Sequence, residues 1–105
     1  MKNVENHLNK LKLIGDCKPR IRKIIIENAD KGLILVINEC VKNFLMGNVK
    51  LNDELMTKIK KYKKIIRNFS NQDCQKRKKE ILVQKGGFLP LLIPTIISVI
   101  SSLIK

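Results

Sequence analysis

The last twenty residues restrict the possible folds of this chain more than any other feature. Residues 88–104 contain no charged side chain, and the most basic stretch of the chain precedes them, separated by Gly86-Gly87. An apolar run of this length has to be covered by protein or by lipid, because a large exposed apolar surface promotes aggregation. We therefore expect two parts: a basic helical unit, residues 1–85, and an apolar segment, residues 86–105, that begins with a double-glycine hinge.

The apolar segment is short for a membrane span. Its seventeen uncharged residues would form a helix of about 25 Å, whereas the hydrocarbon core is about 30 Å thick. Pro90 and Pro94 also disfavour a regular helix in its first half. The segment is typical of a helix that lies in a membrane interface, or of one that packs on the helical unit or on another copy. The predicted apolar contacts are Phe88, Leu89, Leu92, Ile93, Ile96, Ile97, Ile100, Leu103 and Ile104.

The remainder of the chain has the apolar spacing of helices and no alternation typical of strands. We expect a short helix at residues 3–14, a long one at 18–46 and a medium one at 53–69, followed by a weaker segment at 72–84. Pro19 suits the first turn of a helix, and Gly47 suits a helix end. The predicted fold class is all-α: a small three- to four-helix unit, short–long–medium, with a separate apolar C-terminal helix.

The charge balance indicates a polyanionic partner. Lys and Arg together number 22 against 9 acidic residues, a formal net charge of +13, and most of the cations are Lys. Lys neutralises phosphate as a point charge, whereas Arg makes the bidentate contacts that read bases. The pattern therefore favours phosphate binding that is independent of sequence, although a Lys-rich helix face is also common as a simple solvated face.

The cations concentrate between residues 58 and 85, where only Asp73 and Glu80 are acidic. On the medium helix they lie opposite an apolar stripe that contains Tyr62 and Phe69, so these rings are expected in the core and not as platforms for single-stranded bases. Double-stranded DNA is the expected partner. The predicted nucleic-acid contacts are Lys58, Lys60, Lys61, Lys63, Lys64, Arg67, Lys76, Arg77, Lys78, Lys79 and Lys85.

No group of residues in the sequence suggests catalysis, a metal or a cofactor. The cysteines, Cys17, Cys40 and Cys74, are far apart and odd in number, which argues against a disulfide framework and against a zinc site. His7 is the only histidine, so a Cys–His nucleophile is not expected. Cys40 is predicted to be a core residue. We expect a protein that is not an enzyme and that resides in a reducing compartment.

The C-terminal part resembles a known viral family. The block Leu-Pro-Leu-Leu-Ile-Pro at residues 89–94, preceded by Gly86-Gly87 and a basic region, is similar to the C-terminal part of the adenovirus core peptide X (mu) precursor. Small proteins of adenovirus-like Maverick or Polinton elements (adintoviruses) share this order, and the resemblance covers residues 76–104. It implies a virion core protein that neutralises DNA, found in the virion core and the host nucleus. It also implies processing by a viral cysteine protease between Gly87 and Phe88.

Three functions therefore stand as hypotheses. The first is a sequence-independent DNA-binding and condensing core protein. The second is a membrane-active or membrane-anchored protein that contacts a membrane or a capsid component through residues 88–104 and sets its Lys face on anionic lipid. The third is a helical oligomerisation or scaffold module with an interface along residues 33–44.

Overall fold

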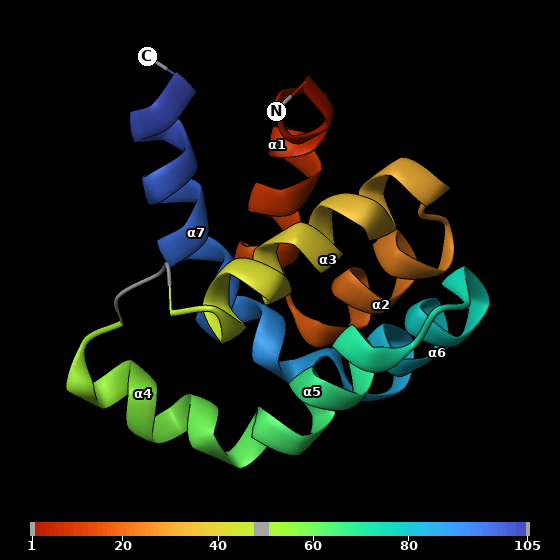
Figure 1. The fold of residues 1–105 in the computed structure, drawn as a ribbon. Helices are drawn as coiled ribbons and strands as arrows, with labels where there is room; N and C mark the ends of the chain where they lie inside the picture. Colours follow the sequence, from red (N-terminus) through yellow and green to blue (C-terminus); the bar gives the residue numbers. More distant parts are fainter. Residues whose placement is uncertain (1, 48–50, 105) are drawn as a thin grey trace.

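The computed structural model describes the backbone of residues 2–47 and 51–104, and the side chains of residues 7, 9–47 and 51–97. Every element in these ranges is helical, so the predicted all-α class is confirmed. Figure 1 shows the helices gathered around α3. In chain order the elements are α1 (Lys2–Asp16), α2 (Pro19–Glu27), α3 (Lys31–Leu45), α4 (Asp53–Ile59), the 3₁₀ helix η1 (Lys60–Tyr62), α5 (Lys63–Asn71), α6 (Gln75–Lys85), the 3₁₀ helix η2 (Gly86–Phe88) and α7 (Leu89–Ile104).

The predicted long helix is wrong as a single element, because the chain breaks between α2 and α3. The Asn28 side-chain amide donates to the Ile24 carbonyl at 2.9 Å, and Asp30 accepts the Leu33 N–H at 2.8 Å. Short polar side chains that bond nearby backbone groups in this way end one helix and begin the next. The two outer ends agree with the prediction: Pro19 opens α2, and Gly47 follows α3 with a positive φ of 78°.

The predicted medium helix is present with one local change. Residues 60–62 tighten into η1, so α4 and α5 are separate α-helices. Asn52 begins α4 by accepting the Leu55 N–H at 2.8 Å. The predicted apolar stripe is confirmed, since Ile59, Ile66 and Phe69 are fully buried. The opposite face of these elements is left to solvent.

The apolar segment is a central part of the fold. Phe88, Leu89, Leu92, Ile93 and Ile96 are at most 2% exposed and belong to the same core as Leu11, Leu33 and Ile66. Helix α7 packs mainly on α1, and Figure 1 shows the two side by side. The prediction of a separate C-terminal helix is therefore wrong for the described side chains, because the helices before it rely on this segment to complete their core. Ile97 is half-buried, and the side chains of Ile100, Leu103 and Ile104 lie outside the described residues.

The double glycine permits close packing and does not form an open hinge. Gly86 and Gly87 lie in η2, and Gly86 is buried. A Cβ added to Gly87 would lie 3.3 Å from the Tyr62 hydroxyl oxygen, and one added to Gly86 would lie 3.4 Å from Leu89 Cδ1. A Cβ at Gly87 would therefore require the Tyr62 side chain to shift by a few tenths of an ångström, whereas one at Gly86 would be close to ordinary van der Waals contact. Through this turn α6 continues almost directly into α7.

Candidate nucleic-acid interface

The basic surface consists of nine exposed cations on α4, η1, α5 and α6. On α4 to α5 they project opposite the buried stripe of Ile59, Ile66 and Phe69, because a helix that buries one face presents the other to solvent. Their exposure leaves the charged groups free to follow a phosphate backbone. The basic surface is formed by Lys58, Lys60, Lys61, Lys63, Lys64, Arg67, Lys76, Arg77 and Lys85.

Lys78 is not part of this surface, which corrects the prediction that it contacts nucleic acid. Its residue is 6% exposed, and its Nζ donates to Asn38 Oδ1 at 2.6 Å. The same ammonium lies 4.8 Å from the centroid of the Phe69 ring. Burial is the main cause that lowers the pKa of Lys78 from its ordinary value; repulsion by Lys42 adds to this effect. The ammonium thus joins α6 to α3 and α5 and is unavailable to a phosphate.

Lys79 is also engaged within the fold. Its Nζ donates to the Ala29 carbonyl at 2.8 Å, so it satisfies a backbone acceptor just after α2. Its side chain is only partly buried, unlike that of Lys78. Of the eleven predicted contacts, the structure therefore places nine on the exposed surface and two in structural roles. Sequence spacing contains a signal for Lys78, since it lies four residues before Leu82 and shares its inward helix face.

Few carboxylates neutralise the basic surface. Lys58 Nζ lies 3.3 Å from Glu54 Oε1, and Arg77 lies 3.9 Å from Glu80 Oε2. Both pairs are well exposed, so each contributes little to stability and is easily exchanged for another anion. These are the ion pairs found among the described side chains. The other cations of the surface have no carboxylate within ion-pair distance among the described side chains.

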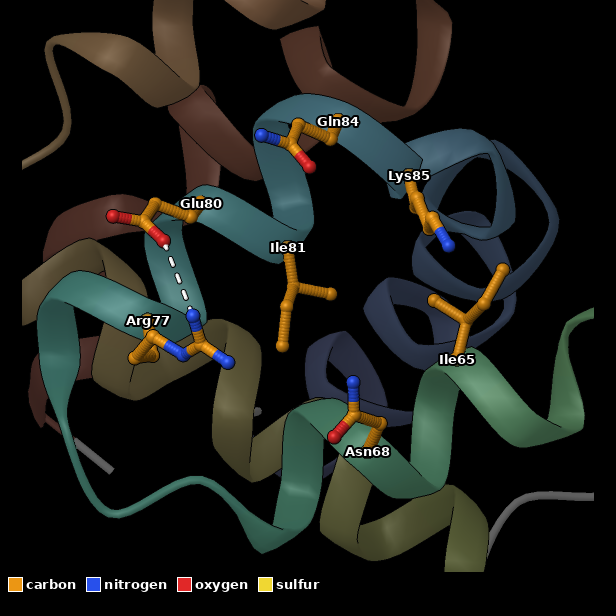
Figure 2. Close-up of a pocket in the computed structure, with 7 residues that line it drawn as sticks. All are labelled: Ile65, Asn68, Arg77, Glu80, Ile81, Gln84 and Lys85. Atoms are coloured by element: carbon orange, nitrogen blue, oxygen red, sulfur yellow. Dashed lines mark ion pairs between the residues drawn. The ribbon is translucent and has the colours of Figure 1, made fainter.

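A hollow lies between α5 and α6, within the basic surface. Its volume is about 200 Å³, and Figure 2 shows its lining. Ile65 and Ile81 are its apolar lining residues, and polar and charged side chains from both helices form the rest of the lining. A hollow of this size is smaller than the sites that hold drug-sized ligands. It is lined by Ile65, Asn68, Arg77, Glu80, Ile81, Gln84 and Lys85.

The predicted processing point lies inside the folded core. Gly86 is buried, Gly87 is partly buried, and Phe88 is 0% exposed within a 3₁₀ helix. Only an opened state of the protein would present the Gly87–Phe88 bond to a protease. The predicted membrane contacts are likewise turned inward where their side chains are described. The helical run Gln75–Ile97 has an 18-residue window of mean hydropathy 1.4, and 39% of that window is buried inside the protein.

The segment predicted to form an oligomer interface lies largely within the chain's own core. Leu33, Ile37 and Val41 are fully buried, whereas Leu35 is 37% exposed. Cys40 packs among them as predicted, and burial raises the pKa of its thiol to about 12. Cys40 is thus a neutral core side chain at neutral pH. Among the described residues, no group of His, Cys, Asp and Glu could hold a metal ion.

Comparison with models of protein families, with curated proteins and with solved structures found no match to this chain. The resemblance to the adenovirus mu precursor therefore stays a prediction that rests on the residues quoted for it. The basic surface and the hollow are the features from which a function can be argued.

Proposed function

We propose that the protein binds double-stranded DNA through its phosphate backbone, without reading base sequence, and that it condenses DNA as a component of a virion core. The observation that carries the binding proposal is the basic surface. It has nine exposed cations, and only two of them form ion pairs with a carboxylate among the described side chains. A compact folded unit with such a surface neutralises phosphates and releases their counterions. The likeness of residues 76–104 to the mu precursor supports the core-protein role.

The arrangement of the cations favours backbone contacts over base readout. Seven of the nine are Lys, and Arg67 and Arg77 lie on different helices. The aromatic rings that could stack on bases are engaged inside: Phe69 and Phe88 are fully buried, and Tyr62 lies against Phe88 with ring centroids 6.5 Å apart. Among the described side chains, the basic surface thus lacks freely exposed aromatic rings on which unpaired bases could stack.

A salt titration of the full-length chain with a labelled DNA duplex tests the proposal. The affinity should fall by orders of magnitude between low and physiological salt, with similar values for unrelated sequences. The triple variant Lys60→Glu, Lys64→Glu, Lys76→Glu should abolish binding. Its matched control, Lys12→Glu, Lys18→Glu, Lys23→Glu, has the same net charge but alters exposed positions on α1 and before and within α2. Equal loss of affinity in both variants would show that general charge, not this surface, drives binding.

Binding to anionic vesicles, measured beside binding to duplex DNA, tests the hypothesis that the protein acts at a membrane. Vesicles and duplex DNA both present phosphates, so the basic surface alone does not distinguish them. Leu89, Leu92, Ile93 and Ile96 of α7 are inside the core, which favours DNA as the partner of the folded protein. Vesicle binding that exceeds DNA binding at the same salt concentration would overturn the proposal.

A further inference from the structure

The hollow between α5 and α6 is the part of the basic surface that has a defined shape. Its lining from α6 includes Arg77 and Lys85, which are eight residues apart. Eight residues of α-helix cover about 12 Å, so the two cations can contact different phosphates of one strand. The hollow is thus proportioned for a short length of backbone and not for a single ion.

The chemistry of the lining matches such a backbone. Arg77 and Lys85 supply positive charge toward the two ends, and the amides of Asn68 and Gln84 supply neutral hydrogen-bonding groups. Ile65 and Ile81 add apolar surface to the lining, which suits the C–H surface of the sugars. Figure 2 shows these side chains converging from both helices.

Glu80 is the one carboxylate in this lining. It lies 3.9 Å from Arg77, and the two side chains are 47% and 67% exposed, respectively. A pair so long and so exposed is weak, so an incoming phosphate can replace the carboxylate on the guanidinium. Until then Glu80 occupies Arg77 and repels the anion.

We infer that this hollow holds one strand of the bound DNA backbone, with Arg77 and Lys85 as its phosphate contacts and Glu80 as an internal competitor for Arg77. The inference rests on the proposed function. It adds the place where a DNA strand binds, the two residues that contact its phosphates, and a residue that weakens binding. The basic surface outside the hollow then acts as general attraction, while the hollow fixes where the strand lies.

Two matched pairs of variants of the full-length chain test this inference. Glu80→Gln and Glu54→Gln each remove one carboxylate from an exposed ion pair on the basic surface, but only Glu80 lines the hollow. We expect duplex affinity to rise about fivefold in Glu80→Gln and less than about twofold in Glu54→Gln.

Arg77→Gln and Lys76→Gln form the second pair, and each removes one cation from neighbouring positions. Arg77→Gln should weaken binding about tenfold, whereas Lys76→Gln, which lies outside the hollow, should weaken it only about twofold.

The outcomes separate this inference from the proposed function. If the wild type binds duplex DNA with a steep salt dependence but the members of each pair behave alike, the hollow is not the strand site and the inference fails alone. If the wild type does not bind DNA, the function fails and the inference with it. A poly-glutamate peptide is titrated in parallel; a Glu80→Gln effect on that peptide without one on DNA would assign the hollow to acidic protein and overturn the inference. Thermal melting of each variant checks that these exposed substitutions leave the fold intact.

Discussion

At the scale of single residues, the most informative position is Lys78. A buried ammonium needs a compensating partner, because desolvation of an unpaired charge is costly. Here the partners are Asn38 Oδ1 at 2.6 Å and the face of the Phe69 ring. The contact joins three helices, and Arg77 and Lys85 on other faces of α6 are exposed. A lysine that the charge pattern predicts as a DNA contact thus has a structural role.

Removing one partner of this buried pair should cost more than removing both. Asn38→Leu leaves the Lys78 ammonium without its acceptor, and we expect the free energy of unfolding to fall by about 2–3 kcal/mol in urea denaturation. Adding Lys78→Met should restore much of this loss, since an apolar pair of similar volume needs no compensation. The exposed control Lys76→Met should change stability by less than about 0.5 kcal/mol. A double variant as unstable as Asn38→Leu would show that the ammonium escapes to solvent.

At the scale of helices, α6 has two faces with different tasks. Lys76 and Arg77 are exposed, whereas Lys78 and Lys79 are directed toward α3 and the end of α2. The run of four cations at residues 76–79 cannot act as one patch, because successive helical residues point about 100° apart. The side of α6 on which each residue lies, and not its charge, decides whether it is exposed or packed against another helix.

Lys79 and Lys76 should therefore show opposite effects. Lys79→Met removes the hydrogen bond to the Ala29 carbonyl, and we expect a loss of about 0.5–1.5 kcal/mol in the free energy of unfolding with little change in duplex affinity. Lys76→Met should weaken DNA binding and leave stability unchanged. Urea denaturation and fluorescence anisotropy on the same two proteins check this. If Lys79→Met weakens DNA binding as much as Lys76→Met does, its ammonium leaves Ala29 to meet the phosphate.

The sequence predicts the features of these helices that depend on local chemistry. The buried stripe of Ile59, Ile66 and Phe69, the start at Pro19 and the stop at Gly47 all follow from spacing and turn preferences. The break at residues 28–30 is harder to predict, since the apolar spacing continues through it. One contact that supports the break is the hydrogen bond from Lys79, fifty residues away. Local sequence patterns cannot predict a contact between residues so far apart in the chain.

At the scale of the whole molecule, the apolar segment illustrates the same limit more strongly. Composition alone makes residues 88–104 a candidate for lipid, because nothing in the segment itself identifies what covers it. The covering surface is supplied mainly by α1, with contributions from α3 and α4, and all three are distant from α7 in sequence. Gly15 of α1 lies against α7, and a Cβ there would lie 3.4 Å from Ile93 Cγ2, close to ordinary van der Waals contact. The basic and apolar parts of the sequence are thus joined in one core.

Removing the apolar segment should unfold the protein. A chain that ends at Gly87 loses five nearly fully buried side chains, each contributing about 1.5–3 kcal/mol, against a total stability of about 5–15 kcal/mol for a typical domain. Circular dichroism should show lost helicity and no cooperative thermal transition. In the full-length chain, Phe88→Ala should cost about 3–5 kcal/mol, whereas Leu13→Ala, at a position 56% exposed, should cost less than about 0.5 kcal/mol. A truncated chain that melts cooperatively would restore the prediction of two separable parts.

The net charge should make folding and DNA binding respond to salt in opposite directions. Folding gathers the cations into a body with a radius of gyration of 12.6 Å, compared with about 33 Å for an unfolded chain of this length. Screening this repulsion should raise the melting temperature by about 5 °C between roughly 0.02 M and 0.3 M NaCl, while duplex affinity falls over the same range. The Lys12→Glu, Lys18→Glu, Lys23→Glu variant should melt higher at low salt and respond less to added salt. A melting temperature independent of salt would mean that the exposed Lys side chains already relieve the repulsion by extending into solvent.

If the melting temperature and the duplex affinity respond to salt in opposite directions, bound DNA supplies the counter-charge that the folded protein lacks. Saturating duplex should then stabilise the fold most at low salt, where binding is tightest.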